Sequence, residues 1–192
     1  MELKDITLGF ALTGSFCTIE KILPQIELMT KHTKNVIPIF SPVVYNTDTR
    51  FTDAKKLAQQ VEQITKNKII KTIPEAEPIG PKKTIDALVI APCTGNTASK
   101  IANGITDTSV TMAAKASMRN KIPVVIAIST NDGLSGSARN IGTLLNTKGI
   151  YFVPFGQDDF IKKETSLVSD MTLIKDTLEQ ALAGKQIQPI LV

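Results

Sequence analysis

Small polar residues cluster in four short segments of this sequence, and each cluster directly follows an apolar run. The segments are Thr13-Gly14-Ser15, Ser41-Pro42-Val43, Pro92-Cys93-Thr94-Gly95-Asn96-Thr97 and Ser129-Thr130-Asn131-Asp132. Hydroxyl and amide groups beside the free backbone N–H groups of helix starts bind phosphate without needing arginine. We therefore expect these segments to bind a small molecule that carries a phosphate and several hydroxyl groups.

Few residues in the sequence could move a proton or form a covalent bond. Asn131, Asp132 and Cys93 are the catalytic candidates, because they lie within the polar segments. Buried cysteines are usually packing residues, and inert packing is the role expected of Cys17. The adjacent carboxylates Asp158-Asp159 are expected in a solvated loop or at a subunit contact, so we predict no metal site.

Motifs that bind the common nucleotide cofactors are absent. The turn after the first apolar run lacks G-x-G-x-x-G, no Walker A sequence occurs, and no acidic residue ends the second apolar run at residues 36–40. Those features hold the phosphates and ribose of NAD(P) and ATP. The pattern therefore favours flavin mononucleotide (FMN) over both.

Apolar runs and helical stripes alternate along the chain. Strands are expected at residues 6–12, 36–40, 87–91, 123–128 and 150–153. Apolar residues at helical spacing predict helices around residues 19–29, 57–64, 97–101, 110–118, 141–145 and 167–182. Continuous apolar runs are typical of buried parallel strands, whereas Pro38 places the second strand at an edge of the sheet.

This alternation predicts an α/β fold in which helices cover both faces of one parallel sheet. Length and strand number favour a flavodoxin-like, or Rossmann-like, three-layer sandwich with strand order 2-1-3-4-5, and a six-stranded Rossmann domain is the alternative. In that order the ligand lies between the first and third strands, beyond their carboxyl ends. Residues 1–192 are expected to form a single domain.

Composition and charge exclude several classes of function. The formal net charge is only +4, and the chain has three arginines and no tryptophan, which argues against a nucleic-acid partner. No apolar stretch is long enough to span a bilayer, and the first residues do not form a signal peptide. We therefore expect a cytoplasmic protein whose cysteines are thiols.

The polar segments resemble those of the homo-oligomeric flavin-containing cysteine decarboxylase superfamily. Its flavin loop reads approximately P-A-S-A-N-T, followed by a helix and G-[IL]-[AS]-D. This chain has Pro92-Cys93-Thr94-Gly95-Asn96-Thr97 and then Gly104-Ile105-Thr106-Asp107, and Thr13-Gly14-Ser15 matches the superfamily's first loop, T-G-[SG]. The resemblance to one branch of the superfamily runs nearly end to end.

The resemblance implies an FMN site and assigns residues to it. Gly14, Ser15 and Ser41 would hold the phosphate and ribityl chain, and residues 92–97 would pass along the flavin ring. Ser129 and Thr130 would close the site from the next strand. The superfamily also implies a homo-oligomer, often built from trimers.

Two further segments, Ser129–Leu134 and Val153–Asp159, indicate one branch of the superfamily. That branch implies one subunit of a two-subunit oxidoreductase that oxidises a dihydro precursor to pyridine-2,6-dicarboxylate in the mother cell of a spore-forming bacterium. The other subunit resembles a pyridine-nucleotide dehydrogenase, so NADPH is expected there and not on this chain.

Two alternative functions remain open from the sequence. One is a stand-alone flavin-dependent decarboxylase or flavin prenyltransferase. The decarboxylases of the superfamily use a histidine between the second and third strands, whereas the single histidine here, His32, is expected on the first helix. The other alternative is a scaffold protein that has kept the fold without the flavin.

Overall fold

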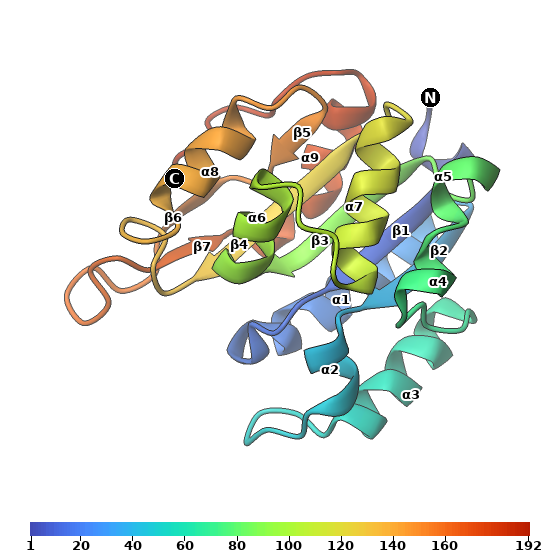
Figure 1. Cartoon of the computed structure of the whole chain (residues 1–192), viewed down its shortest axis with the longest axis horizontal. Helices are drawn as coiled ribbons and strands as arrows, with labels where there is room; N and C mark the ends of the chain where they lie inside the picture. The colour runs from blue at the N-terminus through green and yellow to red at the C-terminus, as the bar shows by residue number, and fades with distance from the viewer.

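Five parallel strands form the centre of the sheet in the computed structural model, which describes residues 1–192 (Figure 1). They are β1 (Thr7–Leu12), β2 (Asn35–Phe40), β3 (Ala87–Cys93), β4 (Val124–Thr130) and β5 (Ile150–Phe152). Their order is β2-β1-β3-β4-β5, with Leu8 opposite Ala87 and Leu88 opposite Val124. The predicted 2-1-3-4-5 order is therefore confirmed for the parallel strands, and β2, which contains Pro38, lies at one edge.

A short antiparallel extension of the sheet escaped the sequence-based prediction. Strands β6 (Phe155–Gln157) and β7 (Leu167–Ser169) form a hairpin, and β7 pairs with the carboxyl end of β4 at Ser129 and Thr130. The prediction that the last helix begins at Leu167 is wrong. Helix α9 spans Ile174–Leu182, after a 3₁₀ turn at Met171–Leu173. The apolar spacing of this region suits either structure, and the long-range pairing with β4 decides in favour of a strand.

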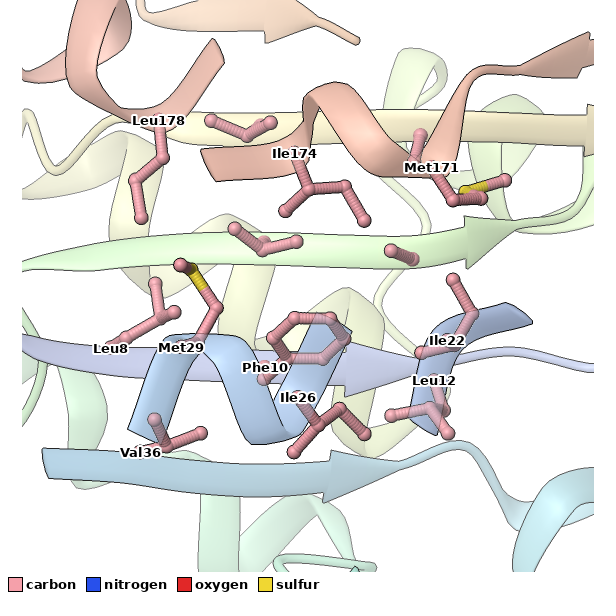
Figure 2. Packing of buried hydrophobic residues seen from close by; sticks show 14 of the residues in the cluster. Leu8, Phe10, Leu12, Ile22, Ile26, Met29, Val36, Met171, Ile174 and Leu178 are labelled. Atoms are coloured by element: carbon pink, nitrogen blue, oxygen red, sulfur yellow. The ribbon is translucent and has the colours of Figure 1, made fainter. Parts of the chain in front are cut away.

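Helices α1 (Ile19–His32) and α9 cover one face of the sheet, and α3 (Ala54–Thr65) flanks α1. Figure 2 shows apolar side chains of both helices packed over alternate residues of β1. The β1 residues are Leu8, Phe10 and Leu12, and the helix residues are Ile22, Ile26 and Met29 of α1 and Ile174 and Leu178 of α9. The intervening strand residues, such as Ala11, face the opposite cluster, as the period of two in a strand requires. Helix α1 runs through Pro24 after a 3₁₀ turn at Phe16–Thr18.

A second group of helices covers the other face (Figure 1). They are α4 (Ile73–Ala76), α5 (Ile79–Lys82), α6 (Gly95–Ala102), α7 (Ser109–Arg119) and α8 (Ala138–Leu145). Helix α2 (Pro42–Asn46) follows β2 directly. The central strands are parallel, so their carboxyl ends lie at one edge of the sheet. The helices that follow β1, β2, β3 and β4, namely α1, α2, α6 and α8, therefore begin near this edge, where the ligand was expected.

The C-terminal tail covers the edge of the sheet beyond β5 and β6. The Gln186 side chain accepts a hydrogen bond from Phe152 N (2.8 Å) and donates one to Phe152 O (2.7 Å), so it pairs with β5 as a strand would. Phe155 of β6 then pairs with Ile190 and Val192 through its backbone. These contacts satisfy backbone groups that would otherwise form an open edge. None of the helices combines the length and apolar character needed to cross a membrane.

Candidate functional site

A cleft of about 370 Å³ lies where the loops after β1, β2 and β3 meet. Its lining consists of ten residues: Thr13, Gly14, Ser41, Pro42, Val43, Thr94, Asn96, Thr97, Lys100 and Thr108. Six of the twelve predicted cofactor-binding residues line it directly: Thr13, Gly14, Ser41, Thr94, Asn96 and Thr97. Its position between the first and third strands is the switch point that the strand order predicts.

Thr13 joins the two strands that flank the cleft. Its hydroxyl donates a hydrogen bond to Pro92 O (2.8 Å) and accepts one from Thr94 N (2.9 Å). Its backbone N–H also donates to Pro92 O, and the side chain is buried. Thr13 therefore fixes the distance between the β1 loop and the β3 loop, and the walls of the cleft are held before any ligand arrives.

The Ser41 hydroxyl is a buried polar group without a hydrogen-bond partner. Ser41 is 6% exposed, and its Oγ contacts no donor or acceptor in the protein. Although Ser41 immediately precedes α2, its side chain does not cap that helix. An unsatisfied buried hydroxyl is costly and rare in folded proteins. Its place in the cleft lining indicates that a ligand supplies the missing partner.

Two helices of eight or more residues begin at the cleft. Thr94 caps α6 by accepting a hydrogen bond from Thr97 N (3.2 Å), and Thr108 caps α7 by accepting one from Thr111 N (3.1 Å). The remaining N–H groups of a first helical turn have no partner within the helix and carry partial positive charge. The donor set of the cleft therefore suits a phosphate or another anion.

Gly14 allows the first loop to approach the second closely. A Cβ atom at Gly14 would lie 2.9 Å from Cγ1 of Val43, a distance that real side chains avoid. The close contact with Val43 therefore explains why a glycine occupies this position of the T-G-S segment: a side chain here would displace Val43 from the cleft wall.

The predicted residues Ser15 and Ser129 meet outside the cleft lining. Their hydroxyl oxygens lie 2.8 Å apart, and Ser129 Oγ is also 2.9 Å from Thr18 Oγ1. The loop after β1 thus reaches across the end of β3 to β4. Sequence reasoning missed Thr18, because nothing in its local pattern distinguishes it from other residues of a helix start.

Thr130 and Asp132 belong to a second polar network. Asp132 Oδ1 accepts hydrogen bonds from Thr130 Oγ1 (2.5 Å) and Ser137 Oγ (2.9 Å). Gly95 packs against this network so closely that a Cβ there would lie 2.7 Å from Asp132 Oδ1. The carboxylate therefore orders the loop after β4 against the start of α6. Asn131 is exposed, and its carbonyl accepts a hydrogen bond from Thr165 Oγ1.

The two cysteines have opposite environments. Cys93 is fully buried, and this burial raises the pKa of its thiol to about 12, so it stays protonated near neutral pH. Cys17 is exposed, which corrects the expectation that it is an inert packing residue. The two remain free thiols, as expected.

The other titratable residues singled out from the sequence lie elsewhere. His32 is in the last turn of α1, which runs away from the carboxyl edge, and its Nδ1 lies 2.9 Å from Leu28 O. Asp158 pairs with Lys163 (2.6 Å), and Asp159 accepts backbone hydrogen bonds from Ile161 and Lys162. A second cavity of about 400 Å³, lined by Lys83, Lys121 and Tyr151 among others, contains none of the predicted site residues.

Comparison with known proteins agrees with this architecture. The model of the Flavoprotein family matches residues 1–173, so the chain belongs to that family. The chain is also 48% identical over 191 residues to the B subunit of dipicolinate synthase from Bacillus subtilis (strain 168), and the match covers 100% of this chain and 96% of the relative. That similarity places it, more narrowly, in the family of dipicolinate synthase B subunits.

Solved structures support the narrower assignment and the fold. The crystal structure of the dipicolinate synthase B subunit from Bacillus halodurans C superimposes with a TM-score of 0.91 at 45% identity, covering 100% of this chain and 98% of the other. The FMN binding protein AtHal3 shares the fold, with a TM-score of 0.65 at 20% identity, covering 95% and 99% of the two chains. Together, the family model and the Bacillus relatives indicate a redox-related enzyme subunit of the Flavoprotein family.

Proposed function

We propose that residues 1–192 form a single domain that acts as the B subunit of a dipicolinate synthase and binds FMN in the cleft between β1 and β3. In this role the chain contributes to the oxidation of a dihydrodipicolinate precursor to dipicolinate during sporulation. The observation that carries the FMN site is the buried, unpartnered hydroxyl of Ser41 within a cleft that has no acidic lining residue.

The residues of the cleft fit the parts of a phosphorylated flavin. Gly14, Ser41 and the start of α6 offer donors for the phosphate and ribityl hydroxyls. Asn96 and Thr97 present an amide and a hydroxyl beside the expected path of the ring. Bound flavin would supply two-electron redox chemistry, and the chain's own residues would bind and orient it.

The remaining predicted residues would act around the cleft. Pro92 and Cys93 end β3 and Gly95 begins α6, while Ser15, Ser129 and Thr130 order the neighbouring loops through their hydrogen bonds. Asn131 is the catalytic candidate that keeps a free, exposed side chain, whereas Asp132 is held in its network and Cys93 is a buried thiol. We therefore propose Asn131 as the candidate for contact with substrate.

The partner in this proposal is the A subunit of dipicolinate synthase. The Bacillus subtilis relative is named as one subunit of that enzyme, which supports an assembly with a second kind of chain. NADPH would bind to the partner, because this chain lacks the motifs that hold a pyridine nucleotide. We also propose a cytoplasmic homo-oligomer in the mother cell of a spore-forming bacterium.

The stand-alone decarboxylase is the weaker alternative. No histidine lines the cleft, and the cleft contains no cysteine or carboxylate that could replace one. The flavin-free scaffold differs from the main proposal in one measurable property, because a scaffold would not bind FMN.

The first experiment is to purify the chain and record its visible absorption spectrum, and then to titrate it with FMN by fluorescence quenching. We expect either the absorption bands of bound flavin or a micromolar dissociation constant, which corresponds to about −8 kcal/mol. A colourless protein that does not quench FMN would overturn the cofactor site and favour the scaffold.

The second experiment tests the partner. The chain and the A subunit of the synthase are assayed together and separately for dipicolinate formation from the dihydro precursor with NADP⁺, before and after FMN is removed by dialysis. We expect activity only with both chains present. Full activity of either chain alone would contradict the proposed division of roles.

A further inference from the structure

Lys100 is the single charged side chain in the lining of the cleft. It lies in the last turn of α6, one helical turn beyond Asn96 and Thr97, which line the same cleft. Side chains four residues apart share a helix face, and helical side chains lean towards the helix start. Lys100 therefore lies on the same face of α6 as Asn96 and Thr97.

Lys100 also forms an ion pair with Asp107. The distance from Lys100 Nζ to Asp107 Oδ2 is 2.7 Å, and the Lys100 side chain is only 24% exposed, whereas that of Asp107 is 52% exposed. An ammonium group has three N–H donors, so the ion pair leaves donors for a ligand. Asp107 itself is not part of the cleft lining.

Within the cleft lining itself the charge is positive, because the carboxylate that pairs with Lys100 lies outside the lining. Alongside Lys100, the starts of α6 and α7 direct partial positive charge at the same space, and no lining residue is acidic. The unpartnered hydroxyl of Ser41 adds a neutral donor in the same lining. Such a site favours an anionic group over a neutral one of the same shape.

We propose that Lys100 is the charge-selecting residue of this cleft and that it makes ligand binding depend on an anionic oxygen group. This inference deepens the proposed function, on which it rests, by assigning a residue to ligand selection. Two sources could supply the group, the phosphate of FMN or a carboxylate of the dicarboxylate substrate. Both are recognised by the same ammonium N–H donors, and their binding is measured separately.

The test compares the binding of FMN, riboflavin and dipicolinate by wild type and four variants. Lys100→Gln removes the charge, Lys100→Arg keeps it, and Asp107→Asn removes only the ion-pair partner. Lys55→Gln, at an exposed position on α3, is the matched control for loss of one positive charge. Circular dichroism melting curves confirm that each variant is folded.

If Lys100 contacts the phosphate, Lys100→Gln weakens FMN binding roughly tenfold, the usual size for a lost charge-assisted hydrogen bond, and leaves riboflavin binding unchanged. If it contacts a substrate carboxylate, the same variant weakens dipicolinate binding and not FMN binding. In either case Lys100→Arg retains most of the affinity, while Asp107→Asn and Lys55→Gln bind as wild type does.

Other outcomes overturn the inference. Equal weakening of FMN and riboflavin by Lys100→Gln, or the same loss in Asp107→Asn, would show that the ion pair only stabilises the cleft wall. If Lys100→Gln binds all three ligands with unchanged affinity, charge selection by Lys100 is refuted. The proposed function stands in that case as long as the wild-type chain binds FMN. A wild-type chain that binds none of the three ligands would refute both.

Discussion

The hydroxyl of Ser15 lies 2.8 Å from that of Ser129, although Ser15 follows β1 and Ser129 lies near the carboxyl end of β4, two strands that β3 separates in the sheet. The contact means that the first loop crosses the carboxyl end of β3. With Thr13 joined to Pro92 and Thr94, the first loop is hydrogen-bonded to the carboxyl ends of both β3 and β4. The loops around the cleft are therefore hydrogen-bonded to one another and form a connected framework.

Removing the Ser129 hydroxyl should loosen this framework. Ser129→Ala leaves the hydroxyls of Ser15 and Thr18 without their shared partner, so we expect a loss of about 1 kcal/mol in the free energy of unfolding. Urea denaturation measures the change. Ser135→Ala, at an exposed position, is the control, and equal values for the two variants would contradict a special role for the contact.

Gly95 should not tolerate a side chain. In Gly95→Ala the added Cβ would lie 2.5 Å from Thr130 Oγ1 and 2.7 Å from Asp132 Oδ1, so the start of α6 must shift. We expect a destabilisation of about 1–3 kcal/mol and weaker FMN binding.

Gly142→Ala provides the opposite control for the Gly95 variant. Gly142 lies within α8, and nothing lies within 4 Å of its added Cβ. The substitution should stabilise the chain by roughly 0.5–1 kcal/mol through helix propensity. Thermal melts of both variants test the pair, and similar shifts of the same sign would refute the close packing at Gly95.

Ser41→Ala separates ligand binding from folding. Because Ser41 Oγ is buried without a partner in the protein, its removal should stabilise the ligand-free chain by about 1 kcal/mol in the free energy of unfolding. FMN binding should weaken roughly fivefold, as expected for a lost neutral hydrogen bond. Fluorescence titration and urea denaturation are run side by side, and unchanged FMN affinity would remove Ser41 from the site.

The two thiols should react very differently with a thiol reagent. At pH 8 the exposed Cys17 should react within minutes, whereas Cys93, with a pKa raised to about 12, is thiolate in only roughly one molecule in ten thousand and is sterically shielded. Titration of native protein should therefore count one thiol, and titration in urea two. Two rapidly reacting thiols in the native protein would contradict the burial of Cys93.

The raised pKa of Cys93 also has a consequence for stability. The folded state holds this proton more tightly than the unfolded state, whose thiol has an ordinary pKa near 9.0. The contribution of Cys93 to stability is therefore complete below pH 9 and is lost as the pH rises towards about 12. Cys93→Ala should flatten this alkaline decline in urea denaturation series measured at increasing pH.

Local sequence patterns were sufficient for the parallel core and the place of the cleft. The apolar run at residues 87–91 and the edge position of Pro38 follow from burial and from the missing N–H of proline, both of which act on a few adjacent residues. The polar segments at Thr13 and Thr94 were placed at one site because parallel strands end at a common edge.

Contacts between distant segments decided the rest. Leu167 belongs to a strand because it pairs with Thr130. The apolar spacing around Leu167 is compatible with a helix and does not predict this pairing. The contact between Ser15 and Ser129 likewise depends on how loops that are far apart in the chain cross. The same is true of the cleft lining, which brings Lys100 together with the unpaired Ser41.

Residue types and their order along the chain were enough to predict the polar segments and the edge of the sheet at which their side chains lie, but not the presence of Lys100 and Thr108 in the same cleft. The division of those side chains into ones that line the cleft and ones that brace it came from the folded arrangement. The physical reason is that the role of a hydroxyl depends on whether a neighbour distant in the chain already satisfies it. Ser129 has such neighbours in Ser15 and Thr18, and Ser41 has none.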